Sequence, residues 1–311
     1  MSGSGKIRFP SLNKTDPSSG RDIANIVKLL KDRCVYLGEY DNMDTQVPIM
    51  DIASRIATYE ERGFTTERAQ VNVLMEAAAF AIFRDFPEAF VLFGGATLVL
   101  FHESLRHSAD LDLLSRGAQA PSREEIAASL ERELMPFGEI MELGQLGLEI
   151  DNSDSREGRI FISTNTGQRL FRVDLTRLGS AIESEIEDHR VDGEAGASAV
   201  IKSATKELLL LQKAEAFLLR RAVKARDAYD IHLLKGLGTT LGANLRAHLH
   251  DTVLANEIDS STIAGRIDRV DVKLCTLELR QILPSDVYKV LEVAEFEPLR
   301  NAVRELYEEW L

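Results

Sequence analysis

Two short stretches about a third of the way along the chain decide the fold: Phe93-Gly94-Gly95-Ala96-Thr97 and, shortly after it, His107-Ser108-Ala109-Asp110-Leu111-Asp112-Leu113. The first stretch ends an apolar run over residues 89–93, which is typical of a buried strand that meets a tight turn. Residues 96–105 have helical spacing, and residues 110–114 alternate acidic and apolar side chains. This order predicts a strand, a glycine turn, a helix and a returning strand.

The returning strand carries the chemistry. Asp110 and Asp112 are two residues apart, so both side chains emerge on one face of the strand. Two carboxylates placed in this way can share magnesium, which prefers oxygen ligands. Gly94 and Gly95 open the helix, whose N-terminal N–H groups could receive a phosphate. An acidic pair alone more often marks the solvent-exposed face of a strand. Its position shortly after the glycine turn, however, favours a site for a triphosphate and its metal.

The rest of the chain divides into helical and mixed regions. Helical spacing is expected over residues 22–32, 49–61 and 65–84, then 122–135, with weaker strand signals over 140–143, 160–163 and 170–175. We expect the acidic stretch 183–194 to be a solvated loop and the chain after residue 201 to be wholly helical. The domains predicted from this order are a flexible tail (1–20), an N-terminal helical segment (21–87), a core of strands and helices (88–200) and a helical C-terminal domain (201–311). The fold class is α+β: a mixed sheet with flanking helices, a helical N-terminal segment and a helical C-terminal lobe.

Composition excludes several classes of protein. The chain has 311 residues and a net charge of 37 − 50 = −13, with 44% hydrophobic residues, as in an ordinary globular protein. Its two cysteines, Cys34 and Cys275, are too few for a disulfide scaffold or a zinc module. The N-terminus has no apolar signal core and no run approaches the ~18 apolar residues of a membrane span, so we expect a cytoplasmic protein without a membrane partner.

The glycine turn followed by Asp-x-Asp resembles the nucleotidyltransferase superfamily typified by DNA polymerase β. The surrounding residues, Gly-Gly-Ala-Thr-Leu and then Arg106-His107-Ser108-Ala109-Asp110-Leu111-Asp112, are similar to the AbiEii/AbiGii toxin family, including its MenT-like members. One departure is that Ala96 stands where the family usually has a small hydroxyl residue, with Thr97 next. This resemblance implies that residues 88–200 form a nucleotidyltransferase core.

The resemblance also implies a third carboxylate from a neighbouring strand. Asp174, within the strand-like run Arg172-Val173-Asp174-Leu175, is the first choice, and Glu142 is the reserve. A third carboxylate could accept a proton from an attacking hydroxyl. The alternative is that Asp174 caps the strand or pairs with Arg172 or Arg177.

A second family signature lies in the helical lobe. Lys213 on one helix is followed by Arg226-Asp227-Ala228-Tyr229-Asp230 on the next, and residues three and four apart share a helical face. The alternative is an ordinary exposed ion pair, worth only ~0.3–0.5 kcal/mol. The resemblance favours a Lys213 that neutralises a nucleotide phosphate and an Asp230 that holds Lys213 or Arg226 in place.

The function implied by the resemblance is transfer of a nucleoside monophosphate from a nucleoside triphosphate, with Mg²⁺ as cofactor and release of pyrophosphate. The chain would be the toxin of a toxin–antitoxin pair with a separately encoded antitoxin, and the 3′ end of tRNA is the leading acceptor. The implied catalytic residues are Asp110, Asp112, Asp174 and Lys213, of which the three aspartates also bind the metal. The implied nucleotide-binding residues are Gly94, Gly95, Thr97, Ser108, Lys213, Arg226 and Asp230.

Two other functions stay open: a nucleotidyltransferase that modifies a small molecule or a protein, and a non-catalytic nucleotide-binding protein. The net charge of −13 disfavours a nucleic-acid partner, but its distribution does not. Residues 199–250 hold nine Lys or Arg against four acids, whereas residues 121–200 hold eight against 17. Because Arg220, Arg221, Lys224 and Arg226 gather beside the implied site, a tRNA acceptor is compatible with the chain.

Overall fold

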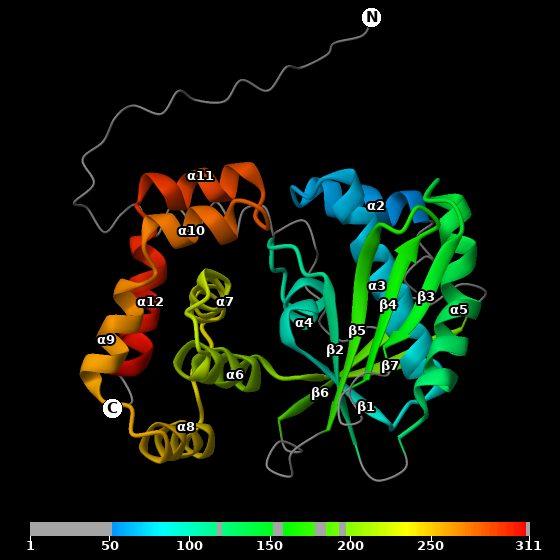
Figure 1. Ribbon diagram of the computed structural model, residues 1–311. Helices are drawn as coiled ribbons and strands as arrows, with labels where there is room; N and C mark the ends of the chain where they lie inside the picture. The colour runs from blue at the N-terminus through cyan, green and yellow to red at the C-terminus, as the bar shows by residue number, and fades with distance from the viewer. Residues whose placement is uncertain (1–51, 117–119, 152–157, 178–184, 193–196, 309–311) are drawn as a thin grey trace, which may run out of the picture. The chain divides into compact units, whose positions relative to one another are not determined.

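A mixed β-sheet organises the first half of the molecule (Figure 1). The computed structural model describes residues 52–116, 120–151, 158–177, 185–192 and 197–308; the predicted tail and the helix expected over 22–32 lie outside them. Within the described residues, seven strands pair in the order β3-β4-β5-β2-β1-β7-β6. The strands are β1 (Phe90–Phe93), β2 (Asp110–Ser115), β3 (Leu146–Asp151), β4 (Gly158–Thr164), β5 (Arg169–Arg177), β6 (Ile186–Asp192) and β7 (Ser198–Ala204).

The register of the central strands sets the position of the acids. β2 runs antiparallel to β1, with Phe93 opposite Asp112, and parallel to β5, with Asp112 opposite Asp174. β1 also pairs in parallel with β7. The strand with the two acids is therefore central in the sheet, and its neighbour β5 carries a further acid at the same level.

In the described part of the chain, the helices of the sheet region are α2 (Ile52–Glu61), α3 (Thr66–Asp85), α4 (Gly94–Phe101) and α5 (Arg123–Ile140). The Thr65 side chain caps α3, and Ser122 and Glu125 form a capping box at the start of α5. Such caps satisfy N–H groups that have no partner within the helix. The apolar sides of α3 and α5 share one hydrophobic core with the buried residues of β1, β2, β4 and β5.

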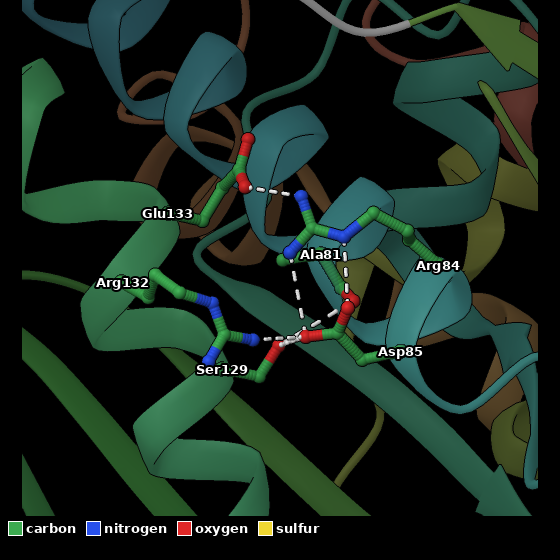
Figure 2. A network of polar contacts seen from close by, with 6 residues as sticks. All are labelled: Ala81, Arg84, Asp85, Ser129, Arg132 and Glu133. Carbon is green, nitrogen blue, oxygen red and sulfur yellow. Dashed lines mark hydrogen bonds and ion pairs between the residues drawn. The ribbon is translucent and has the colours of Figure 1, made fainter. Parts of the chain in front are cut away.

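Polar contacts join the end of α3 to α5 (Figure 2). The Asp85 carboxylate accepts hydrogen bonds from Nε of Arg84 at 2.8 Å, from Oγ of Ser129 at 2.6 Å and from the guanidinium of Arg132. Arg84 also donates to Glu133 at 2.7 Å. The hydrogen bond from Arg84 is the main reason why the pKa of Asp85 is lowered to about 2, so Asp85 stays ionised and these contacts persist at neutral pH.

The C-terminal region is helical and is built around a second hydrophobic core, to which Leu98 of α4 and Ala204 of β7 also belong. Its helices are α6 (Lys206–Leu219), α7 (Ala225–Gly236), α8 (Ala243–Ala255), α9 (Ser260–Asp268), α10 (Val272–Leu279), α11 (Ser285–Val293) and α12 (Glu297–Glu308). Side chains of Thr205, Asp259 and Asp271 cap three of them. Tyr307 of α12 donates a hydrogen bond to the Ala214 carbonyl of α6, which joins the last helix to the first.

The α+β class and the arrangement of a mixed sheet between helical segments are confirmed. The predicted domain boundaries after residues 20, 87 and 200 stay predictions. In the described part of the chain, no helix has the length and apolar character needed to cross a membrane. Cys275 is fully buried, as expected of a small apolar residue, and burial raises its pKa to about 12.

Three expectations about secondary structure are wrong. Within the acidic stretch 183–194, residues 186–192 form edge strand β6, because their backbone pairs with β7 while Glu187, Asp188 and Asp192 remain partly or fully exposed. β7 continues to Ala204, so the chain is not wholly helical after residue 201. Residues 140–143 do not form a strand: α5 continues past Pro136 to Ile140, and the next strand is β3.

Two histidines and a glutamate meet where α4 ends beside β6. Nε2 of His102 and Nε2 of His189 lie 3.4 and 3.3 Å from the same oxygen, Oε1 of Glu187. Burial lowers the pKa of His102 to about 4; the Glu187 charge opposes this shift, and His189 and Lys206 add to it. His102 is therefore neutral in the folded protein over the physiological range.

His102 should make stability depend on pH. In the unfolded chain the imidazole takes up a proton below about pH 6.5, whereas in the folded chain it stays neutral down to about pH 4. The unfolded state thus binds more protons, and stability falls by about 1 kcal/mol between pH 7.5 and 5.5 through this residue alone. Denaturant unfolding of His102→Asn at the two pH values should show a smaller difference than the wild type.

The matched control is His250→Asn, since His250 is exposed on α8. This variant should keep the wild-type difference between pH 7.5 and 5.5. An equal difference in wild type and His102→Asn would show that the buried imidazole does not titrate as described.

Candidate active site

The turn between β1 and α4 brings the start of a helix against a strand carboxylate. Gly94 has φ +77°, and a Cβ there would overlap Oδ2 of Asp112. At Gly95 a Cβ would overlap Nη2 of Arg106 and lie 2.8 Å from Oγ of Ser108. Only glycine fits these positions without displacing the neighbouring side chains. The first turn of α4, whose N–H groups suit an anion, therefore lies directly beside Asp112.

Three carboxylates gather on one face of the sheet. Asp110 and Asp112 alternate along β2, and Asp174 is the register partner of Asp112 on β5. Burial, followed by the charges of Asp110 and Asp174, raises the pKa of Asp112 to about 6, and the cations Lys213 and Arg172 oppose this shift. The cluster thus has an excess of negative charge that favours a bound cation.

Two arginines already contact the cluster. Nε of Arg172 lies 2.9 Å from Asp174 and 3.3 Å from Asp110, and Nε of Arg159 lies 3.7 Å from Asp174. The open alternative, that Asp174 pairs with Arg172, is therefore present in the structure. Oδ1 of Asp174 is buried and has no hydrogen-bond partner, so the ion pairs leave part of its capacity unused.

A fully buried aspartate of α7 binds two cations. Asp230 accepts from Nε and Nη2 of Arg106 at 2.5 and 2.9 Å and pairs with Nζ of Lys213 at 2.8 Å. Burial alone would raise the pKa of Asp230, but Arg106 and Lys213 together hold it below its ordinary value. The predicted link between Lys213 and Asp230 is present, and the second cation is Arg106 rather than Arg226.

The neighbouring signature residues are placed differently. Asp227 is fully buried, its carboxylate oxygens accept no hydrogen bond, and its nearest cation is Arg220 at 3.4 Å. Burial raises the pKa of Asp227. Arg226 is partly exposed on α7. The structure thus unites Lys213 and Asp230 but does not bring Arg226 into contact with the Asp230 carboxylate.

The two hydroxyl residues also differ in position. Ser108 lies beside Gly95, and its Oγ contacts the Asp110 carbonyl at 3.5 Å, so it is at the glycine turn as predicted. Thr97 is fully buried in α4, and its Oγ1 has no hydrogen-bond partner. The reserve carboxylate, Glu142, lies in the turn between α5 and β3 with φ 59°, outside the sheet.

The donor set is suited to a hard divalent cation. All three carboxylates offer oxygen ligands, and the buried Oδ1 of Asp174, which accepts no hydrogen bond, has capacity for a metal ion. With Arg172 among these side chains, however, no group of three or more His, Cys, Asp or Glu in the described residues is arranged to hold a metal directly. The chemistry of the donors fits the ion, and Arg172 and Arg159 pair with the same carboxylates.

A family model described as nucleotidyl transferase AbiEii toxin, type IV toxin–antitoxin system, matches residues 78–281. The chain belongs to this family. The match spans β1, the glycine turn, β2, β5 and helices α6 and α7, so it includes every element of the site described above. The chain is therefore a nucleotidyltransferase of a family of type IV toxin–antitoxin systems.

Solved structures with a similar fold include a candidate nucleotidyltransferase from Helicobacter pylori (19% identity, 79% of this chain and 98% of that one, TM-score 0.46). MenT4, a nucleotidyltransferase toxin from Mycobacterium tuberculosis, is 14% identical over 83% of this chain and 99% of its own, with a TM-score of 0.44. Structural similarity at this level gives no information about the site. No curated protein matches the chain.

Sequence reasoning missed the role of Arg106 and the contact of Arg172 with Asp110. Arg106 stands in the quoted motif, but its partner is 124 residues away on α7, so no local pattern could reveal the pair. Arg172 alternates with Asp174 on β5, and this spacing was the available signal that both side chains share a face.

Asp230→Asn should destabilise the protein strongly. The neutral amide keeps the size of the side chain but leaves Arg106 and Lys213 buried without their counter-charge, which costs about 3–5 kcal/mol. Denaturant unfolding at pH 7.5 measures the loss, and a collapse in soluble yield would agree with it. Asp251→Asn, at an exposed position, should stay within about 0.5 kcal/mol of the wild type. Equal stability of the two variants would contradict the role given to Asp230.

Proposed function

We propose that this nucleotidyltransferase transfers a nucleoside monophosphate from a nucleoside triphosphate to an RNA hydroxyl, with the 3′ end of tRNA as the acceptor. In this proposal the chain acts in the cytoplasm as a toxin that a separately encoded antitoxin restrains. The observation that carries the proposal is the convergence of Asp110, Asp112 and Asp174 beside the first turn of α4. Carboxylates for a metal and N–H groups for phosphates are the two requirements of phosphoryl transfer.

The phosphate-binding role falls to the glycine turn. Gly94 and Gly95 would direct backbone N–H groups at the triphosphate, and Ser108, beside Gly95, would add a hydroxyl donor. Thr97 has an unused hydroxyl in the same helix. Because the two glycines have no Cβ atoms, the start of α4 can lie close to Asp112, and a phosphate bound there would be adjacent to the metal ion.

The three carboxylates would hold Mg²⁺, which when bound neutralises phosphate charge and orients the attacking and leaving oxygens. The acceptor hydroxyl would attack the α-phosphorus, a P–O bond would form, and the bond to pyrophosphate would break. Asp174 would receive the hydroxyl proton. Lys213 contributes to the electrostatics of Asp112 and would offset the charge that develops on the phosphates.

The acceptor surface would include the basic residues at the start of α7. Arg221 is exposed and Arg226 is partly exposed, whereas Arg220 and Lys224 pair with Asp227 and Glu278. These cations follow directly on α6, which carries Lys213, so an RNA backbone lying on them would approach the site. Their positive charge is compatible with an RNA acceptor, and the family resemblance is the reason for placing tRNA first.

The test is to incubate the protein with each labelled nucleoside triphosphate, Mg²⁺ and total RNA, and to identify what carries the label. Asp110→Ala and Lys213→Ala should each reduce transfer by about 10²-fold or more, because the first removes a proposed metal ligand and the second removes positive charge near the phosphates. Both should also abolish growth inhibition on expression. Asp251→Ala, at an exposed position, is the matched control and should keep wild-type activity.

The possible outcomes separate the alternatives. If a small molecule or a protein carried the label instead of RNA, that molecule and not RNA would be the acceptor. Binding of a triphosphate without transfer would favour a non-catalytic nucleotide-binding protein. Transfer at the wild-type rate by Asp110→Ala or Lys213→Ala would show that the site is wrongly assigned.

A further inference from the structure

Arg172 is placed inside the carboxylate cluster by the sheet itself. It is the register partner of Asp110 across the β2–β5 pair, and it precedes Asp174 by two residues on β5. Neighbours across strands and residues two apart on one strand share a face of the sheet. The backbone register therefore fixes a cation between two of the three proposed metal ligands.

The contacts of Arg172 have the form of ion pairs to two separate carboxylates. Its Nε donates a hydrogen bond to Oδ2 of Asp174 at 2.9 Å and lies 3.3 Å from Oδ1 of Asp110. The side chain is 40% exposed, so it can leave the carboxylates by rotation into solvent. An ion pair at this exposure is screened by solvent and holds its partners only weakly.

Charge explains why a cation is needed there. Three carboxylates on adjacent strands repel one another, and Asp112 lies between the other two charges and the buried start of α4. Arg172 acts directly on Asp110 and Asp174, and its charge also reaches Asp112. Without it, the cluster would lose its nearest positive charge.

We propose, on the basis of the proposed function, that Arg172 is the counter-cation of the carboxylate cluster, that is, the protein's own positive charge at this site. Its guanidinium holds Asp110 and Asp174 in the metal-free protein and is displaced from them when a divalent ion binds. Arg172 is thus a positioning residue that keeps three like charges together before the ion arrives, and it competes with the ion for the same oxygens. Removing Arg172 should lower the stability of the metal-free protein and raise its affinity for a divalent ion.

The test uses the full chain and Mn²⁺ alone, without nucleotide or RNA. In isothermal titration calorimetry Arg172→Gln should bind Mn²⁺ about fivefold more tightly than the wild type, the equivalent of ~1 kcal/mol of lost competition. Its thermal midpoint without Mn²⁺ should be lower than that of the wild type, and saturating Mn²⁺ should remove the difference. Arg172→Lys, which keeps the charge, should remain close to the wild type in both measurements.

Arg169→Gln is the matched control. Arg169 is an exposed residue of the same strand whose guanidinium lies over the Phe161 ring at 3.9 Å, and the substitution changes the net charge by the same amount. It should leave Mn²⁺ affinity unchanged. A comparable gain in Arg169→Gln would reduce the effect to overall charge and overturn the proposal.

Other outcomes are equally decisive. Mn²⁺ affinity in Arg172→Gln equal to or weaker than in the wild type would overturn the counter-cation role, even if the wild type transfers label to RNA. Conversely, tighter Mn²⁺ binding by Arg172→Gln that Asp112→Asn abolishes would support the role, even if no nucleotide transfer were found. The failure of this inference is therefore distinguishable from failure of the proposed function.

Discussion

A fully buried carboxylate needs cationic partners, and Asp230 meets this need with two cations from different parts of the chain. Arg106 comes from the segment that leads into β2, and Lys213 comes from α6. Breaking such a pairing leaves charges uncompensated in a medium of low polarity. The Asp230 carboxylate therefore connects the segment before β2 with α6 and α7, the two helices that carry the second family signature. The positions of Arg106 and Lys213, the buried cations of the site, depend on it.

The same arrangement connects this ion pair to the glycine turn. Arg106 lies against Gly95, and Gly94 lies against Asp112, so the start of α4 contacts a cation and an anion at once. A side chain at either glycine would displace one of them. The two glycines are thus required by the close approach of neighbouring side chains as well as by the positive φ at Gly94.

Local patterns predicted much of the fold, and their failures share one cause. The helix start at Thr65 and the strand over 160–163 were readable because caps and alternation are properties of adjacent residues. The edge strand β6 was missed because its acids resemble a solvated loop, and only pairing with β7 makes it a strand. The helix expected to end at residue 135 continues past Pro136 to Ile140, and Phe137, beyond the proline, is buried in the core that α5 shares with α3.

Within the site, the sequence by itself determined the glycine turn, the alternating pair Asp110 and Asp112, and the order in which Asp174, Lys213 and Asp230 follow. These are local spacings, and the family match spans all of them. Only the tertiary structure decided that Asp174 stands opposite Asp112, that Arg172 lies between Asp110 and Asp174, and that Asp230 binds Arg106. Strand register and the partner of a buried charge depend on contacts between residues far apart in the chain, and no local spacing encodes them.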